Sequence, residues 1–128
     1  MAHTYKNSKV DLTTTDITTV YTVPTDTTTI IKSIIVSEDS GSADEITLTI
    51  TNGSDVFSLY KDKAVTAKQT LDLLSTPLVL TTGEILKATA ATANRLHIVC
   101  SYLEITWQHL YMYHKKRYNK FFLLFMIQ

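Results

Sequence analysis

Four histidines are the first residues that could bind a metal or transfer protons: His3, His97, His109 and His114. Zinc sites need ligands at fixed spacings, such as H-E-x-x-H on one helix face or paired Cys and His residues. No combination of these histidines completes such a pattern. We expect His3 in a loose N-terminal segment and His97 on a strand, as an exposed or hydrogen-bonded ring.

Four carboxylates form a second candidate group around the turn-like segment SEDSGSAD at residues 37–44: Glu38, Asp39, Asp44 and Glu45. Carboxylate oxygens are the ligands that calcium prefers, so a calcium loop is one interpretation. The simpler interpretation, which we adopt, is a solvated turn, since Ser, Gly and Asp are common in such turns.

A nucleophile and a phosphate-binding loop are also missing from the sequence. Cys100 is the only cysteine and lies in the apolar run LHIVCSYL, so we expect it to be a small buried hydrophobe. The chain has only 3 Gly and contains no G-x-S-x-G, P-loop or G-x-G-x-x-G pattern. We therefore predict no catalytic residue, no cofactor and no bound metal, and we expect that the protein is not an enzyme.

Charge is unevenly distributed along the chain, although the net charge is zero. Residues 1–106 carry 8 basic and 12 acidic side chains, whereas residues 107–128 carry 4 basic side chains and no acidic one. The acidic main part offers no basic stripe for nucleic acid.

The N-terminal MAHTYKNSK has no apolar core, so we expect no signal peptide and synthesis in a reducing cytoplasm.

The segments that carry the candidate histidines, carboxylates and cysteine have the pattern of strands, because β-branched and aromatic residues recur in short runs between turn residues. We expect strands at 16–23, 27–37, 44–51, 54–61, 70–74, 78–90 (a hairpin turning at residues 82–83) and 94–106. About eight short strands without a convincing helix predict an all-β fold, a single β-sandwich of jelly-roll or immunoglobulin-like form.

Two local patterns make this prediction more specific. The apolar pairs Ile30-Ile31 and Ile34-Ile35 break strict alternation, so either both faces of that strand are covered or a bulge changes its register. Asn52-Gly53 follows a cleanly alternating run, and both residue types tolerate positive φ, which predicts a two-residue hairpin turn at 52–53.

The alternation also predicts which side chains form the core. We expect it to contain Val20, Ile31, Ile35, Ile46, Leu48, Ile50, Phe57, Leu59, Leu71, Leu73, Leu78, Leu80, Leu86, Leu96, Ile98 and Val99.

Residues 107–128, WQHLYMYHKKRYNKFFLLFMIQ, follow a different compositional rule, and we place them outside the domain of residues 1–106. Their longest apolar run is FFLLFMI, too short for the roughly 20 residues of a membrane span. Two interpretations stay open. The segment is an amphipathic helix that docks at an interface or on a partner, or it is the product of a shifted reading frame or a lost stop codon in an AT-rich gene.

Several phrases of the sequence resemble a known family. They are KVDLTTTDITTVYTVP, IIKSIIVSEDSG, AKQTLDLLSTPLVL, GEILKATA and ANRLHIVCSYLEI. Read in this order over residues 5–105, they resemble small β-sandwich virion structural proteins of tailed bacteriophages, especially those of marine myoviruses and podoviruses. Where that family usually has Asn after IIVS, this chain has Glu38.

The resemblance implies a non-enzymatic component of a phage particle, in its tail, neck, fibre or capsid surface. It also implies location in the virion after assembly in the host cytoplasm, and partners that are copies of the chain, as a trimer or ring, and other virion proteins. The alternative is a receptor- or carbohydrate-binding module for a host-surface glycan, for which Tyr60 and Tyr102 are the candidate aromatic residues.

Overall fold

The computed structural model describes residues 2–106, and every regular element in this range is a strand. The nine strands are β1 (Ala2–Leu12), β2 (Thr18–Thr22), β3 (Thr27–Glu38), β4 (Asp44–Asn52), β5 (Asp55–Val65), β6 (Thr70–Asp72), β7 (Leu78–Leu80), β8 (Ile85–Ala90) and β9 (Leu96–Thr106). Within these residues there is no helix long and apolar enough to cross a membrane.

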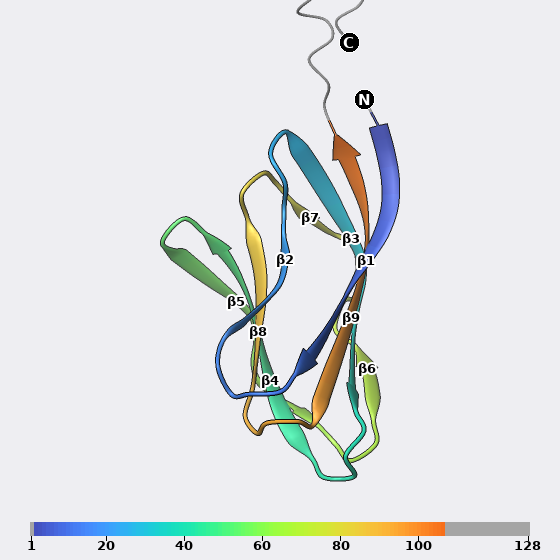
Figure 1. Cartoon of the computed structure of the whole chain (residues 1–128), viewed down its shortest axis with the longest axis vertical. Helices are drawn as coiled ribbons and strands as arrows, with labels where there is room; N and C mark the ends of the chain where they lie inside the picture. Colours follow the sequence, from blue (N-terminus) through green and yellow to red (C-terminus); the bar gives the residue numbers. More distant parts are fainter. Residues whose placement is uncertain (1, 107–128) are drawn as a thin grey trace, which may run out of the picture.

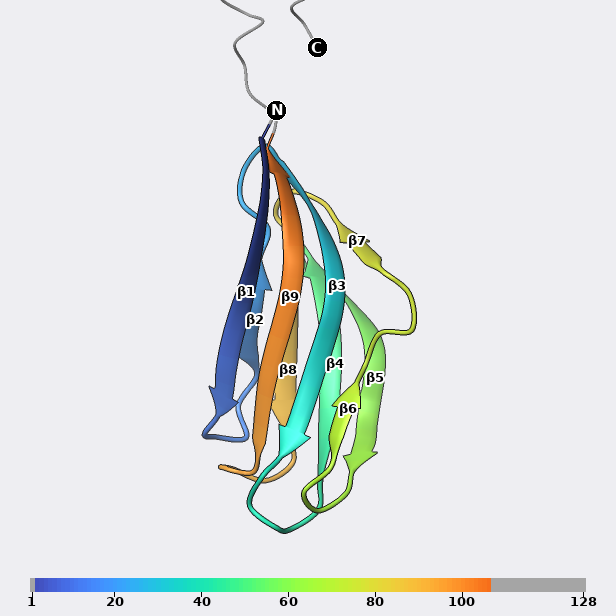
Figure 2. The same cartoon turned by 90° about the vertical axis from the view of Figure 1, so that its right-hand side faces the viewer.

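The strands form two sheets that lie face to face, as Figures 1 and 2 show from two directions. The larger sheet has the order β1-β9-β3-β6, with β7 also paired to β3, and the smaller sheet has the order β2-β8-β4-β5. Each sheet buries one face against the other, and alternating side chains of both faces fill the space between them. The predicted all-β sandwich is confirmed.

The sequence-based strand map omits one strand, β1. This strand pairs with β9 along its whole length, from Ala2 opposite Thr106 to Leu12 opposite Leu96. His3 therefore lies in a paired strand opposite Ile105, and the expectation of a loose terminus is wrong. An edge strand with one solvated face needs few apolar side chains, so AHTYKNSKVDL gives little hydrophobic signal.

In β3 the alternative of a bulge is confirmed. The register with β9 shifts between Ile31 and Ser33. Ile31 and Ile34, three residues apart, are both fully buried as a result. The same shift points Val36 into the core instead of Ile35, which is only half-buried.

The hairpin between β4 and β5 is present, but its turn lies one residue later than predicted. Asn52 pairs with Asp55, so the two turn residues are Gly53 and Ser54. Gly53 has φ +64, as a type II′ turn with glycine in its first central position requires.

The second predicted hairpin, at residues 78–90, is wrong in its pairing. The turn exists, with the amide of Glu84 donating to the carbonyl of Thr81 at 3.0 Å. However, β7 pairs with β3 in the larger sheet, and β8 pairs with β2 and β4 in the smaller one. The connection therefore crosses from one sheet to the other.

The core lies between the two sheets and contains most of the predicted residues. Those confirmed as buried are Val20, Ile31, Ile46, Leu48, Ile50, Leu73, Leu80, Leu86, Leu96 and Ile98. Leu71 and Leu78 are half-buried and pack against this core.

Three further core predictions are wrong. Phe57 and Leu59 on β5 are 57% and 36% exposed, because β5 is the outermost strand of its sheet. Val99 is half-buried, since Ile98 and Cys100 on either side of it point inward. Buried residues that were not predicted include Leu12, Tyr21, Val23, Ile34, Val36, Val65, Ala88, Ala90 and Tyr102.

The expectations for residues 107–128 lie outside the described residues, and the domain boundary at residue 106 stays a prediction. The described chain brings its two ends together, because Ala2 and Thr106 are paired at one end of the larger sheet (Figure 1).

Candidate functional site

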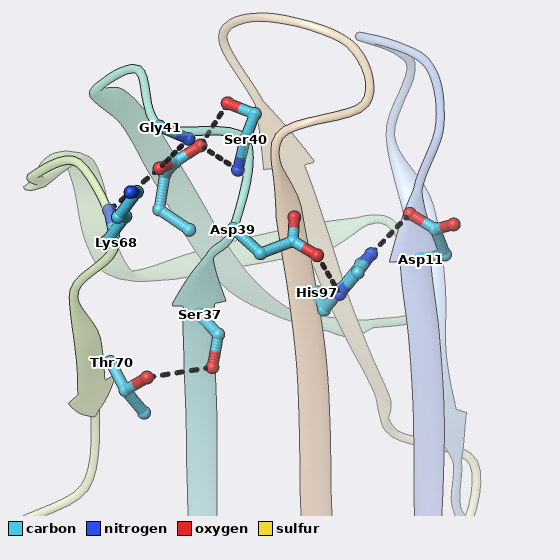
Figure 3. Close-up of polar contacts among 9 residues, drawn as sticks. Asp11, Ser37, Asp39, Ser40, Gly41, Lys68, Thr70 and His97 are labelled. Carbon is cyan, nitrogen blue, oxygen red and sulfur yellow. Dashed lines mark hydrogen bonds and ion pairs between the residues drawn. The ribbon is translucent and has the colours of Figure 1, made fainter.

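The predicted acidic cluster is built around Glu38, the last residue of β3. Its carboxylate accepts hydrogen bonds from the Ser40 amide at 2.9 Å, the Gly41 amide at 3.0 Å and the Lys68 amide at 2.9 Å, and also from the Ser40 hydroxyl. Figure 3 shows Ser40, Gly41 and Lys68 converging from two loops. Burial raises the pKa of Glu38, but these hydrogen bonds outweigh it and lower the pKa to about 2.

The other acids of this cluster point elsewhere, so the four do not form a calcium site. Asp39 contacts His97, and the Asp44 Oδ2 atom accepts a hydrogen bond from the Thr92 amide at 3.2 Å. Within residues 2–106, no three His, Cys, Asp or Glu side chains are grouped so that they could hold a metal ion. The solvated-turn interpretation is also wrong for Glu38 and Asp44, which are 2% and 6% exposed. Glu38 acts as an internal cap that joins the β3–β4 and β5–β6 loops.

His97 lies on β9 between two carboxylates, as Figure 3 shows. Its Nε2 atom is 3.3 Å from Asp11 of β1, and its Nδ1 atom is 3.4 Å from Asp39. The ring is about half exposed and lies on a strand, which agrees with the predicted exposed or hydrogen-bonded strand histidine. The adjacent surface depression is lined by Lys9, Val10, Asp11, His97, Ile98 and Val99, a set without a hydroxyl or thiol nucleophile. The arrangement links three chain segments but offers no nucleophile for catalysis.

Only one of the remaining histidines lies among the described residues. His3 lies in β1, and His109 and His114 lie outside the described residues. Cys100 is buried as predicted, and burial raises the pKa of its thiol to about 12. It therefore stays protonated at neutral pH and is inert as a nucleophile.

A second buried polar cluster, centred on Glu104 of β9, was missed by the sequence analysis. Glu104 accepts a hydrogen bond from the Tyr21 hydroxyl at 2.6 Å and pairs with Lys6 at 2.9 Å. The Tyr21 oxygen also lies 2.7 Å from the Thr29 hydroxyl, and the Tyr21 and Tyr102 rings are 4.1 Å apart. The cluster therefore joins β2 of the smaller sheet to β1, β3 and β9 of the larger one.

The pKa values in this cluster follow from its geometry. Burial raises the pKa of Glu104, but the Tyr21 hydrogen bond and the Lys6 contact outweigh this and hold it below its usual range. The same contact raises the pKa of Lys6. Burial and the bond to Glu104 raise the pKa of Tyr21, so its hydroxyl stays a donor at neutral pH. Strict alternation after Leu96 could have placed Glu104 on the inward face of β9.

The two aromatic residues considered for glycan binding are packed rather than displayed. Tyr102 is 5% exposed, and its hydroxyl lies 3.1 Å from that of Ser8. Tyr60 is half-buried and donates to the Leu73 carbonyl at 3.0 Å. Neither offers a free ring face to a sugar.

The most exposed apolar surface of the smaller sheet lies along β5. Val56, Phe57 and Leu59 are 62%, 57% and 36% exposed. Phe57 pairs with the buried Ile50, so it lies on the core-facing side of the sheet but at its margin. Figure 1 shows the turn end of the β4–β5 hairpin projecting from the body of the sandwich. Exposed apolar edges of this kind are typical of association surfaces.

No protein-family model and no curated protein matches the chain. Solved structures give partial similarities. A pentameric capsid protein isolated from metagenomic phage sequences is 19% identical over 80% of this chain and 60% of that one, with a TM-score of 0.45. The chain thus spans less than two thirds of that protein.

Two other solved structures are similar over a larger share of their own length. The capsid of the Helicobacter pylori bacteriophage KHP30 is 6% identical over 84% of this chain and 95% of that one, with a TM-score of 0.49. The disulfide-linked pili of Bacillus endospore appendages are 9% identical over 83% and 89%, with a TM-score of 0.48.

Proposed function

We propose that this chain is a non-enzymatic structural component of a tailed-phage virion, which assembles through its β-sandwich with copies of itself and with other virion proteins. The proposal rests on the resemblance of residues 5–105 to such proteins and on the order in which the chain connects the strands of the two sheets.

The connectivity of the strands is the observation that supports this function best. Successive strands mostly alternate between the larger sheet (β1, β3, β6, β7, β9) and the smaller sheet (β2, β4, β5, β8), and only the β4–β5 and β6–β7 connections stay within one sheet. Such alternation supports the jelly-roll form of the sandwich over the immunoglobulin-like form, which joins more of its neighbours by hairpins. Jelly rolls are common in viral capsids and also in lectins.

The arrangement of the polar side chains supports an assembly role over catalysis or glycan binding. Its polar clusters, at Glu38, His97 and Glu104, are occupied in joining strands and loops to one another. The packed positions of Tyr60 and Tyr102 remove the aromatic surface on which the glycan alternative depended.

Mass spectrometry of purified particles from the phage that encodes the chain tests the proposal. We expect the chain in many copies per particle, retained after a high-salt wash. Its absence from particles, while it is abundant in the infected-cell extract, would contradict the proposal. A glycan array with the purified full-length chain separates the alternative, since specific glycan binding would favour a receptor module.

A further inference from the structure

A row of apolar side chains crosses the outer face of the larger sheet, the face turned away from the core. Figure 2 views this face, with β1, β9, β3 and β7 side by side. Directly opposite residues of paired strands point to the same side of a sheet. The pairing aligns four such residues, one from each strand: Tyr5 of β1, Leu103 of β9, Ile30 of β3 and Val79 of β7. On β9 and β3 the residues on either side of the row are buried in the core, so the row itself points outward.

The ends of this row are among the most exposed apolar side chains of residues 2–106. Tyr5 and Val79 are 75% and 58% exposed, and Leu103 and Ile30 between them are half-buried. Ile105, on the same face and nearer the end of β9, is half-buried as well. The solvated face of an antiparallel sheet ordinarily carries polar side chains. An apolar row across four strands is instead typical of a surface that another element covers.

The neighbouring rows of the same face differ from it. The next row toward the opposite end of the sheet is polar and consists of Asn7, Ser101 and Ser33. The row after it has apolar residues only at its centre and ends in a charged residue on each side, Lys9 on β1 and Asp72 on β6. The all-apolar row is therefore a local feature of the end of the sheet at which the chain leaves β9.

The segment of residues 107–128 starts beside this row. β9 ends at Thr106, three residues beyond Leu103 and thus roughly 10 Å away along the strand. The row crosses four strands, roughly 14 Å at the usual strand spacing. The segment has 22 residues, which extend roughly 33 Å even in the compact form of an α-helix. It is therefore long enough to turn back and cover the row.

The composition of this segment suits the surface that it would cover. It contains two runs rich in aromatic and apolar residues, WQHLYMY at 107–113 and FFLLFMI at 121–127. Its four basic residues lie between these runs, whereas residues 1–106 carry four more acidic than basic side chains. Burial of apolar surface and the opposite net charges both favour docking of the segment on its own domain.

We propose that residues 107–128 fold back over the outer face of the larger sheet and cover the row of Tyr5, Leu103, Ile30 and Val79 in the same chain. The contact lies outside the core between the two sheets, so loss of the segment would expose the row without opening the core. This goes beyond the proposed function, because a contact within one chain does not depend on whether the chain belongs to a particle.

Trypsin digestion of the full-length chain tests the contact, because the segment contains four cleavage sites, at residues 115–117 and 120. The double variant Tyr5→Ser/Val79→Ser removes the two exposed ends of the row and keeps its half-buried centre. We expect cleavage within the segment to become at least about fivefold faster, since proteolysis of a segment that opens transiently follows the population of its open form.

The double variant Val56→Ser/Phe57→Ser on β5 is the matched control. It also replaces one valine and one aromatic residue, which are 62% and 57% exposed, but these lie in the smaller sheet. It should leave the rate of cleavage within the segment unchanged. Circular dichroism melts establish that both variants are folded.

Paramagnetic relaxation in the full-length chain locates the segment independently of these variants. A nitroxide attached to Asn119→Cys labels a single site, because Cys100 is buried. We expect it to broaden the amide signals of residues 28–31 and 78–80 in the larger sheet more than those of residues 20–22 and 85–87. The second group lies at the same end of the molecule but in the smaller sheet (Figure 1).

Two results would overturn the proposal: cleavage of the Tyr5→Ser/Val79→Ser variant at the wild-type rate, or equal broadening in the two sheets. Isotope-labelled wild type mixed with a spin-labelled chain that carries no isotope should show no broadening. Broadening in that mixture would assign the row to the segment of a second copy and would also overturn the contact within one chain. Absence of the chain from phage particles would contradict the proposed function and leave these results unaffected.

Discussion

The strands β1 and β5 each span 11 residues and each form the edge of one sheet, but they differ in how they pair with the neighbouring strand. β1 pairs with β9 in an unbroken register, and its Lys6 and Ser8 are tied to Glu104 and Tyr102. β5 pairs with β4 through two register shifts and leaves Phe57 exposed. Both are edge strands, so the difference lies in their contacts: the polar β1 is anchored by an unbroken register and by the buried Glu104 and Tyr102, whereas the more apolar β5 stays open.

Truncation of a leucine on each of two adjacent strands gives the largest expected effect. Leu48 of β4 is fully buried, whereas Leu59 of β5 is 36% exposed. We expect Leu48→Ala to lower the free energy of unfolding by about 2–5 kcal/mol. Leu59→Ala should cost no more than about 0.5 kcal/mol. Urea unfolding measures both, and equal losses would show that β5 is part of the core.

Gly53→Val should have the next largest effect, because it acts on the turn that sets the register of β5. Gly53 has φ +64, and no atom lies within 4 Å of a Cβ built there, so the cost is backbone strain and not a clash. A β-branched residue in this conformation should cost about 1–3 kcal/mol. Ser54→Ala is the control and should be near neutral. An equally stable Gly53→Val variant in thermal melts would argue against this turn.

Glu104→Gln tests the anchoring of β1 and should cost on the order of 1 kcal/mol, since the amide keeps an acceptor but loses the charge that holds Lys6. The folded-state pKa of Glu104 lies below its usual range. Its stabilisation is therefore present above the ordinary carboxyl range and is lost as pH falls through the lowered pKa. Unfolding measured against pH should show a smaller acid dependence in Glu104→Gln, and identical curves would contradict the anchoring role.

The smallest effect is expected from removal of residues 107–128. If the sandwich is complete without them, the chain ending at Thr106 should melt within a few degrees of the full-length chain. A fall of more than about 10 °C would mean that the segment packs into the sandwich, and the boundary at residue 106 would be wrong.

The contrast between β1 and β5 also explains what could be predicted from the sequence. Local patterns predicted the β4–β5 hairpin, the alternative of a bulge in β3 and most of the core. Pairing partners were not predictable, because they are set by contacts distant in sequence. β1 lacks an apolar pattern, β7 and β8 only look like a hairpin, and Phe57 looks buried until β5 is known to be an edge.

The polar residues considered as candidate sites show the same division between local features, which were predictable, and distant contacts, which were not. His97 and Cys100 were placed correctly from their own strand, since alternation is a local property. The roles of Glu38 and Glu104 depend on loops and strands far along the chain, such as Lys68 for the first and Lys6 and Tyr21 for the second. A carboxylate with distant partners has no signature in its own neighbourhood.

Hydrogen–deuterium exchange of the full-length chain, measured by mass spectrometry, tests most directly whether β5 is the open edge and β1 the anchored one. We predict faster exchange in peptides covering residues 55–61 than in peptides covering residues 2–12, because β5 pairs with β4 through two register shifts whereas β1 pairs with β9 without a break. Equal exchange in the two strands, or faster exchange in β1, would contradict the account.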